Sequence, residues 1–286
     1  GRLALRIKFC RVAIELYREG GGQVKILDGR VLAKKIFDRL MTCPKPAKQL
    51  AILVPANNDK ASEGFIAEIR DAAQSLAVAT RILYRADGAT TKDFVEDLQR
   101  WGSDPSIGGA VLILPLPPGV DRESVLSAMP ILKDIDCLNP ETKGIMPPAS
   151  RAVYHIWFEI IPKELRCIGD PCKVAMVGRG LLIGKPIARF LSAYCHPVSV
   201  FGRNSDLSEL AEAELVILGT GVPKLISPTM LKPGAAVIDF GYPGDFDSGH
   251  PEADKIGWYV PAKGGTGPLL VACLMETFYQ LTVGLK

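Results

Sequence analysis

The chain has 286 residues, 48% of them hydrophobic and 23% charged, which is the composition of an ordinary globular protein of one or two domains. Its 34 basic and 31 acidic residues leave a formal net charge of +3, too near balance to indicate a nucleic-acid or membrane surface. No apolar run approaches the roughly 20 residues that a membrane-spanning helix needs, and seven cysteines without CxxC spacing favour a reducing compartment over a disulfide framework.

The opening stretch, residues 1–22, is rich in arginine and poor in acids. Before its first acid, Glu15, it carries four basic residues: Arg2, Arg6, Lys8 and Arg11. This pattern resembles a processed mitochondrial targeting sequence, so we expect a mitochondrial protein. The alternative, given equal weight, is an amphipathic N-terminal helix, ended by the glycines at 20–22, on a cytoplasmic protein.

Strand and helix patterns alternate over the next part of the chain. A helix is expected after Asp28-Gly29, because apolar residues recur there at helical spacing. Apolar, strand-like runs follow at 50–54, 79–84 and 109–114, and they alternate with helical patterns at 62–76 and 91–101. This alternation predicts a parallel sheet with helices on both faces.

A segment rich in Pro, Asp and Gly, residues 133–150, predicts an irregular connection and a domain junction. A second α/β pattern follows it, with strands expected at 173–177, 197–201, 215–218 and 236–240, a helix at 185–194, and a final helix at 269–285. The predicted architecture is a two-domain α/β protein with parallel sheets, in which an N-terminal α/β domain is joined to a Rossmann-like NAD(P)-binding domain. The expected division is an extension at 1–22, a first domain at 23–146 plus 269–286, and the Rossmann-like domain at 147–268.

A glycine-rich turn connects the strand at 173–177 to the helix that follows it. Gly178, Gly180 and Gly184 give the spacing G-x-G-x-x-x-G. In this setting small residues let the backbone approach a pyrophosphate, and the amides at the helix start favour its negative charge. The turn therefore predicts dinucleotide binding, with a tight turn that binds no ligand as the alternative.

The next strand ends in Phe-Gly-Arg-Asn at 201–204, where an NAD-binding domain would place an acid for the ribose hydroxyls. Because no acid stands there, Arg179 and Arg203 favour NADP if a dinucleotide binds. The alternative for both arginines is that they are solvated loop charges.

Six segments resemble the signatures of the bifunctional methylenetetrahydrofolate dehydrogenase/cyclohydrolase family, in that family's order and over nearly the whole chain from Ile26. They are ILDG at 26–29, LPLP at 114–117, KDID at 133–136, VGR at 177–179, IGKP at 183–186 and GGTGP at 264–268. The resemblance implies a folate-type catalytic domain, a Rossmann-like domain, NADP-dependent chemistry in one-carbon metabolism, and a homodimer paired through the nucleotide domains.

The family places a serine, a tyrosine and a lysine on one helix beside the folate, where this chain has Ser62, Phe65 and Ile69. The resemblance implies that the lysine handles protons in cyclohydrolysis and that the tyrosine contacts the pterin. The family's glutamine just before LPLP corresponds to Ile113. Three polar groups have thus become apolar, so we expect ordinary packing there and no catalytic residue. Arg70 is no substitute, because a guanidinium does not release its proton at usable pH.

At other positions this chain differs from the family's residue in some cases and matches it in others. The serine after the family's Gly-Arg corresponds to Gly180, and its Pro-Cys-Thr-Pro loop corresponds to PPAS at 147–150. Asp136 matches the aspartate that would hold the pterin, and with Gly264 and Gly265 it would bind substrate if that binding is retained. We favour another interpretation, in which Asp136 caps a loop at the domain junction and tetrahydrofolate does not bind.

The histidines, His155, His196 and His250, show no metal-type spacing and are interpreted as surface or packing residues, so no metal is expected. Cys195-His196 is interpreted as chance adjacency and not as a catalytic dyad, because neighbouring side chains point apart.

Three hypotheses result. The preferred one is a catalytically silent family member without a cofactor, a structural or binding subunit of a homo- or hetero-oligomer in a larger mitochondrial assembly, where contact with nucleic acid stays open. The second is an NADP-dependent methylenetetrahydrofolate dehydrogenase with weak or absent cyclohydrolase activity. The third is a nucleotide-sensing regulator that keeps the turn without the chemistry.

Overall fold

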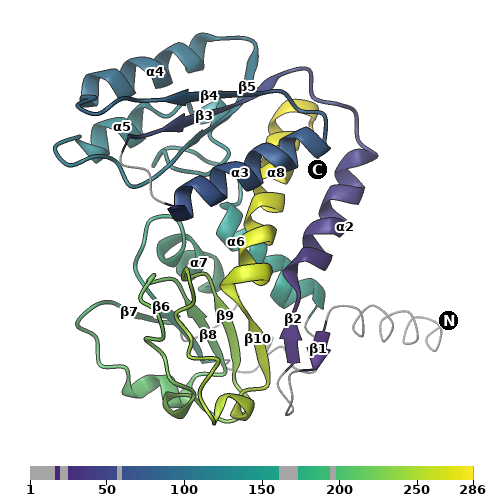
Figure 1. Cartoon of the computed structure of the whole chain (residues 1–286), viewed down its shortest axis with the longest axis vertical. Helices are drawn as coiled ribbons and strands as arrows, with labels where there is room; N and C mark the ends of the chain where they lie inside the picture. The colour runs from purple at the N-terminus through teal and green to yellow at the C-terminus, as the bar shows by residue number, and fades with distance from the viewer. Residues whose placement is uncertain (1–16, 20–24, 57–59, 161–172, 194–197, 286) are drawn as a thin grey trace. The chain divides into compact units, whose positions relative to one another are not determined.

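The computed structural model describes residues 17–19, 25–56, 60–160, 173–193 and 198–285 (Figure 1). Contacts divide the chain into two units, Gly1–Lys34 with Ala149–Leu270 and Lys35–Pro148 with Val271–Lys286. We call them the seven-stranded unit and the three-stranded unit, after the sheets they contain. None of the helices in the described ranges is both long and apolar enough to span a membrane.

The three-stranded unit is built on a parallel sheet of order β4-β3-β5, as the alternating pattern predicts. Its strands are β3 (Gln49–Val54), β4 (Thr80–Tyr84) and β5 (Ile107–Leu112). Residues 50–54 of β3 and all of β5 are buried, which is typical of parallel strands covered on both faces. The helices between and after the strands are α3 (Lys60–Ser75), α4 (Thr91–Ser103) and α5 (Arg122–Ala128).

Helix α3 forms because its apolar residues recur every three or four positions. Ile66, Ile69, Ala73 and Leu76, just past its end, are all buried and make one stripe along its length. Helix α4 begins at a capping box, in which the Asp93 N–H donates to Thr90 Oγ1 and the Thr90 N–H donates to Asp93 Oδ2. The sequence expectations for both helices are confirmed to within two residues at each end.

The C-terminal helix α8 (Gly267–Val283) is almost wholly apolar, as expected of a buried helix. In the three-stranded unit it approaches β5 closely, since a Cβ added to Gly109 would lie 2.6 Å from Cδ2 of Phe278. Its buried Glu276 forms an ion pair with Arg39 of helix α2 (Gly29–Met41). Only glycine at 109 leaves room for this packing.

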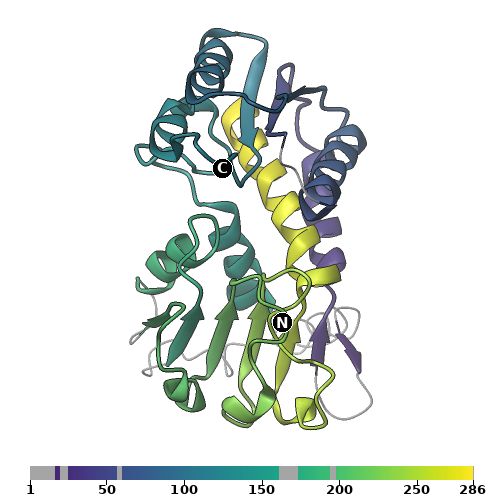
Figure 2. The ribbon, with the colours of Figure 1, turned by 60° about the vertical axis from the view of Figure 1, so that its left-hand side comes forward.

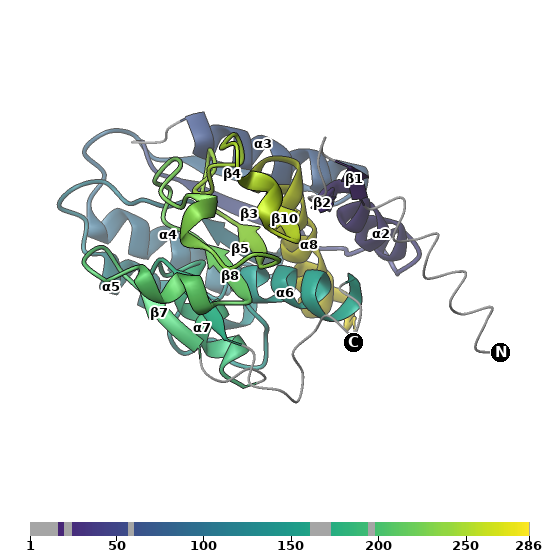
Figure 3. The same ribbon diagram turned by 90° about the horizontal axis from the view of Figure 1, so that it is seen from below.

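The seven-stranded unit contains a sheet of order β1-β2-β10-β9-β8-β6-β7, whose strands are parallel except for the antiparallel pair β1-β2 (Figure 2). The strands are β1 (Tyr17–Glu19), β2 (Lys25–Leu27), β6 (Val174–Val177), β7 (Val198–Phe201), β8 (Leu215–Leu218), β9 (Ala236–Asp239) and β10 (Trp258–Val260). Helix α7 (Gly184–Leu191) packs against β6 and β7 and lies beside β7 in Figure 3, and α6 (Pro148–Tyr154) belongs almost wholly to this unit.

A cluster of buried side chains lies in this unit, with residues from β6, β7, β8, β9 and β10 and from the segments between these strands. Short helical turns complete the connections of both units: Ile131–Lys133, His155–Ile160, Ser208–Glu212, Pro228–Met230, Ala253–Lys255 and Ala262–Thr266. The Rossmann-like parallel architecture expected for this half of the chain is confirmed.

The structure differs from the sequence expectations where elements are short. β2 and β10 pair in parallel, although neither three-residue strand was expected. This pairing places residues 25–34 in the seven-stranded unit and not in the first domain. Tyr17–Glu19 is a strand instead of the end of a helix, while the rest of the expected N-terminal helix lies outside the described residues. α5 and α6 have seven residues each, too few for a helical period to show in the sequence.

Candidate functional site

The glycine turn after β6 lies where the order of the sheet reverses. β6 pairs with β7 on one side and with β8 on the other, so the loops after these strands diverge from a common edge. In open parallel sheets this switch point, at the carboxyl ends of the strands, is where ligands bind. The sequence motif and the topology therefore indicate the same site.

Two of the three glycines are required by space. Gly178 has φ +115°, and a Cβ there would lie 2.5 Å from the Gly219 carbonyl oxygen, while a Cβ on Gly184 would lie 2.1 Å from the Gly178 carbonyl oxygen. The turn is fixed by hydrogen bonds from the Gly178 N–H to the Phe201 carbonyl (2.9 Å) and from the Lys185 N–H to the Gly180 carbonyl (3.0 Å). A pyrophosphate could therefore approach the backbone of this turn closely.

Gly180 differs from the other two, because no atom lies within 4 Å of a Cβ placed on it and its φ is not positive. A larger residue is therefore compatible with the local backbone. Gly180 is exposed, and its lack of a side chain is not required by any neighbouring atom of the described chain.

Arg179 is held at the end of β7. Its Nη2 donates to the Val200 carbonyl (3.0 Å), and a Cβ added to Gly202 would lie 3.1 Å from its Nε. The Arg179 guanidinium therefore packs against Gly202 at the end of β7. Arg203 follows Gly202 and is exposed. The strand end offers positive charge and no carboxylate at 201–204, which suits a phosphate.

The glycines predicted at 264 and 265 follow β10, so they lie along the same carboxyl edge of the seven-stranded sheet as the turn after β6. A Cβ on Gly29, after β2, would lie 1.8 Å from the Gly265 carbonyl oxygen, and Gly264 has φ +78°. Arg30 is fixed by Asp28, whose Oδ1 accepts from the Arg30 Nε (2.9 Å), and its guanidinium lies over Gly264. The structure therefore brings the segments after β2 and β10 together, which their separation in the sequence did not indicate.

The apolar replacements expected in the folate-type part all lie in the three-stranded unit. Ile69 is 0% exposed, in the middle of the buried stripe of α3, and Ile113 is 4% exposed. The Ile113 N–H donates to the Leu53 carbonyl (2.9 Å), which extends the β3-β5 ladder by one residue. Phe65 is half-buried. None of the three side chains carries a proton that can be transferred.

The loop-capping role expected for Asp136 belongs to Asp134 instead. The buried Asp134 carboxylate accepts from the N–H groups of Leu138 (3.0 Å) and Asn139 (2.8 Å) and from Thr142 Oγ1 (2.7 Å). The expectation was wrong because the segment turns back toward residue 134, two positions earlier than assumed. Lys133 also has a structural role, since its ammonium donates to two carbonyl oxygens at the end of α4.

The Asp136 carboxyl is half-buried and makes no hydrogen bond or ion pair within the described residues. Burial raises its pKa to about 8, and the nearby charge of Asp134 adds to the shift.

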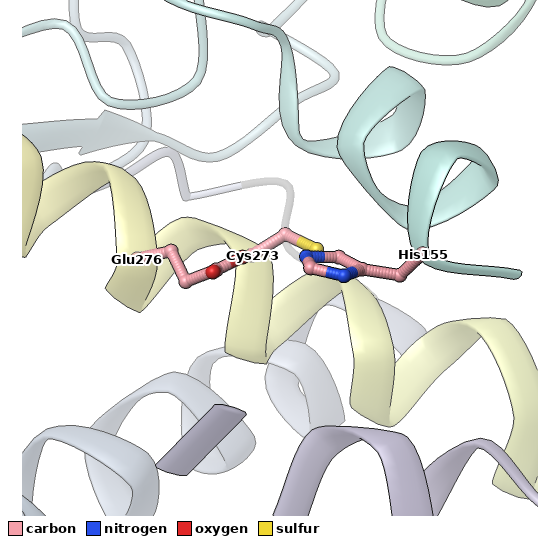
Figure 4. Close-up of side chains that lie close together, drawn as sticks. All are labelled: His155, Cys273 and Glu276. Atoms are coloured by element: carbon pink, nitrogen blue, oxygen red, sulfur yellow. The ribbon is translucent and has the colours of Figure 1, made fainter. Parts of the chain in front are cut away.

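The remaining candidates divide between packing and loop roles. The ring of the buried His155 packs edge-on against Tyr154 at 5.8 Å between centroids, and His250 Nδ1 accepts from the Glu252 N–H (3.1 Å). His196 and Cys195 lie outside the described residues. Figure 4 shows Cys273 and Glu276 one turn apart on α8, in the three-stranded unit, and His155, which belongs to the seven-stranded unit.

Comparison with known proteins covers both units. The model of the tetrahydrofolate dehydrogenase/cyclohydrolase catalytic domain matches residues 27–136, and that of the tetrahydrofolate dehydrogenase/cyclohydrolase NAD(P)-binding domain matches residues 163–284. The bifunctional protein FolD of Chloroflexus aggregans is 29% identical over 279 residues, which cover 90% of this chain and 97% of that protein.

Solved structures agree with the sequence matches. The 5,10-methylenetetrahydrofolate dehydrogenase of the silkworm Bombyx mori has a TM-score of 0.79 and 26% identity, and the match covers 91% of this chain and 98% of that one. A Trypanosoma brucei methylenetetrahydrofolate dehydrogenase-cyclohydrolase, solved with NADP and an inhibitor, has a TM-score of 0.79, 24% identity and the same coverage, and so shares the fold.

We predict that Gly184→Ala destabilises the protein, because the new Cβ would lie 2.1 Å from the Gly178 carbonyl oxygen. The free energy of unfolding should fall by about 2–3 kcal/mol, the cost of forcing an atom into packed backbone. Gly180→Ala is the matched control and should change it by less than about 0.5 kcal/mol. Urea unfolding measures both, and equal effects of the two substitutions would contradict this account of the turn.

We also predict a pH dependence from Asp136. Its pKa is raised from 3.8 to about 8 on folding, so the folded state keeps a proton that the unfolded state loses, and stability falls as pH rises between these values. The slope is at most about 1.4 kcal/mol per pH unit. Asp136→Asn should flatten the profile, while the exposed Asp87→Asn should leave it unchanged. Parallel profiles for the wild type and Asp136→Asn, from urea unfolding across that range, would sink the prediction.

Proposed function

This chain belongs to the tetrahydrofolate dehydrogenase/cyclohydrolase family, and we propose that it binds NADP but has lost the acid and base chemistry of the cyclohydrolase step. The observation that carries the proposal is the burial of Ile69 at 0% exposure within the apolar stripe of α3, at the position of the family's lysine. Proton transfer requires a side chain with an exchangeable proton within reach of the substrate. Phe65, Ile69 and Ile113 supply none.

The glycine turn supports NADP as the ligand of the seven-stranded unit. Gly178 and Gly184 have no room for side chains, so the backbone amides of the turn and of the start of α7 can approach a pyrophosphate. Arg179, held by the Val200 carbonyl, and the exposed Arg203 would meet the 2′-phosphate. When bound, the nicotinamide supplies hydride-transfer chemistry, and the protein orients it.

We further propose that the protein acts as a binding or structural subunit and not as an enzyme, in a homo- or hetero-oligomer within a mitochondrial assembly. The absence of transferable protons at the three family positions supports the loss of the cyclohydrolase step, and the arginine-rich, acid-poor opening stretch supports the mitochondrial location. Imaging of a fluorescent fusion of the full-length protein tests the organelle. If NADP binding changes the assembly of this protein with its partners, the protein would act as a nucleotide-sensing regulator.

A second candidate function is an NADP-dependent methylenetetrahydrofolate dehydrogenase without cyclohydrolase activity. Asp136 favours it, because its carboxyl has no partner within the described residues and matches the aspartate that would hold the pterin. The Gly264–Gly265 turn, which follows β10 on the carboxyl edge of the seven-stranded sheet, is retained as well. Hydride transfer needs no proton-transferring side chain, so the loss at positions 65, 69 and 113 does not preclude it.

We predict that the purified protein binds NADP in calorimetry, forms no NADPH from methylenetetrahydrofolate and does not hydrolyse methenyltetrahydrofolate. Arg179→Ala should weaken NADP binding at least about tenfold by removing a charge-assisted contact to phosphate, and should change NAD binding much less. The exposed Arg189→Ala, on α7, is the control.

The outcomes separate the candidates. NADPH formation without cyclohydrolase activity would establish the dehydrogenase, and cyclohydrolase turnover would contradict the proposed loss of acid and base groups. Failure to bind NADP would leave a subunit without a cofactor and would overturn the role given to the turn.

A further inference from the structure

Two buried acids stand behind the glycine turn in the seven-stranded unit, and neither was singled out in the sequence. Asp239 ends β9 and Asp245 lies in the loop that follows it, and both are 0% exposed. No ion pair recorded for the described residues includes either of them. Burying a carboxylate without a cation is costly, so the hydrogen bonds that these two groups accept must be important locally.

Asp239 organises the loop that follows its own strand. Its Oδ1 accepts from the Gly241 N–H (2.8 Å) and its Oδ2 from the Phe246 N–H (3.0 Å). Its carbonyl accepts from Thr266 Oγ1 (2.6 Å). The loop of residues 240–246 is therefore folded back on the end of β9, which places Asp245 beside the neighbouring strand β8.

Asp245 holds the loop that follows β8. Its Oδ2 accepts from both the N–H (2.6 Å) and the Oγ1 (2.8 Å) of Thr220, and Thr220 Oγ1 in turn accepts from the Val222 N–H (3.1 Å). The two loops are also joined along the backbone, where the Ile226 N–H donates to the Asp245 carbonyl (2.9 Å). One carboxylate oxygen thus fixes the start of the loop after β8.

The loop after β8 packs directly against the glycine turn after β6. Gly219 directly precedes Thr220. A Cβ on Gly178 would lie 2.5 Å from the carbonyl oxygen of Gly219. A Cβ on Gly219 would lie 2.6 Å from Cγ2 of Ile183, in the turn itself. Any shift of Thr220 is therefore transmitted by direct contact to the backbone that would receive the pyrophosphate.

The other oxygen of Asp245 makes no hydrogen bond in the described structure, although it is buried. It lies against Gly241, where a Cβ would be 1.9 Å away. The side-chain hydrogen bonds that the Asp245 carboxylate accepts in the described structure thus both come from Thr220. A side chain that served only to fill space would not need charge here, because a buried carboxylate with an unsatisfied oxygen destabilises the fold.

We propose that Asp245 is the positioning residue of the dinucleotide site: through Thr220 it holds the loop after β8 against the Gly178 turn in the geometry that binds the dinucleotide. This inference rests on the NADP binding proposed above. It assigns to Asp245 an effect on cofactor affinity that acts through another residue.

The test compares Asp245→Ala, Asp245→Asn and Thr220→Val in the full chain, with the exposed Asp254→Ala of the same unit as control. NADP affinity should fall at least about tenfold in Asp245→Ala, because a charge-assisted pair of hydrogen bonds is lost, and about threefold in Thr220→Val, which loses one of them. Asp245→Asn should recover most of the affinity, since its amide oxygen accepts the same two hydrogen bonds. Asp254→Ala should match the wild type.

Hydrogen exchange without ligand gives the second readout. Amides at 219–226 and in the turn at 178–184 should exchange faster in Asp245→Ala and at the wild-type rate in Asp245→Asn, with the three-stranded unit unchanged. Unaltered exchange, or wild-type NADP affinity in both Asp245→Ala and Thr220→Val, would overturn the proposal. If the wild type fails to bind NADP, the proposed cofactor is wrong, and the exchange comparison still decides whether Asp245 positions the loop. If Asp245→Ala does not fold, Thr220→Val and Asp245→Asn decide it.

Discussion

The close approach of backbone to backbone at the carboxyl edge of the seven-stranded sheet is the constraint on which the candidate site depends. Gly178 meets the carbonyl of Gly219, and Gly184 meets the carbonyl of Gly178, at distances that admit no side chain. The loops after β6 and β8 can therefore approach each other this closely only with glycine at these positions, as in the turns that bind a pyrophosphate. Arg179 can lie at the end of β7 because Gly202 also lacks a side chain.

The three-stranded unit is governed by the opposite requirement, the removal of polar groups from a packed interior. Ile69 lies in the same apolar stripe as Ile66 and Ala73, so α3 needs no partner for a charge in its middle. Asp134 is buried in the same unit and accepts hydrogen bonds there, and the pKa of Asp136 is raised by burial and by the nearby charge of Asp134. The chain thus combines a glycine turn at the carboxyl edge of one sheet with apolar side chains at positions 65, 69 and 113 of the other unit.

The sequence predicted what depends on local pattern and missed what depends on pairing across the chain. The long strands and helices, the parallel sheets, the glycine turn and the burial of Ile69 and Ile113 all follow from periodicity, spacing and residue type. β2 and β10 were missed because three residues carry no period and their pairing joins distant segments. The capping role of Asp134 was missed because only the path of the loop decides which carboxylate meets the amides of residues 138 and 139.

Ile69 is packed in an apolar interior, and the free energy of unfolding of Ile69→Lys tests most directly whether this position has lost the hydrated cleft proposed for the family's lysine. Burial of an unpaired ammonium should lower that free energy by about 3 kcal/mol or more, whereas Ile69→Met should lower it by less than about 1.5 kcal/mol. A lysine tolerated at position 69 as well as methionine would mean that a hydrated cleft persists there, and would contradict the account.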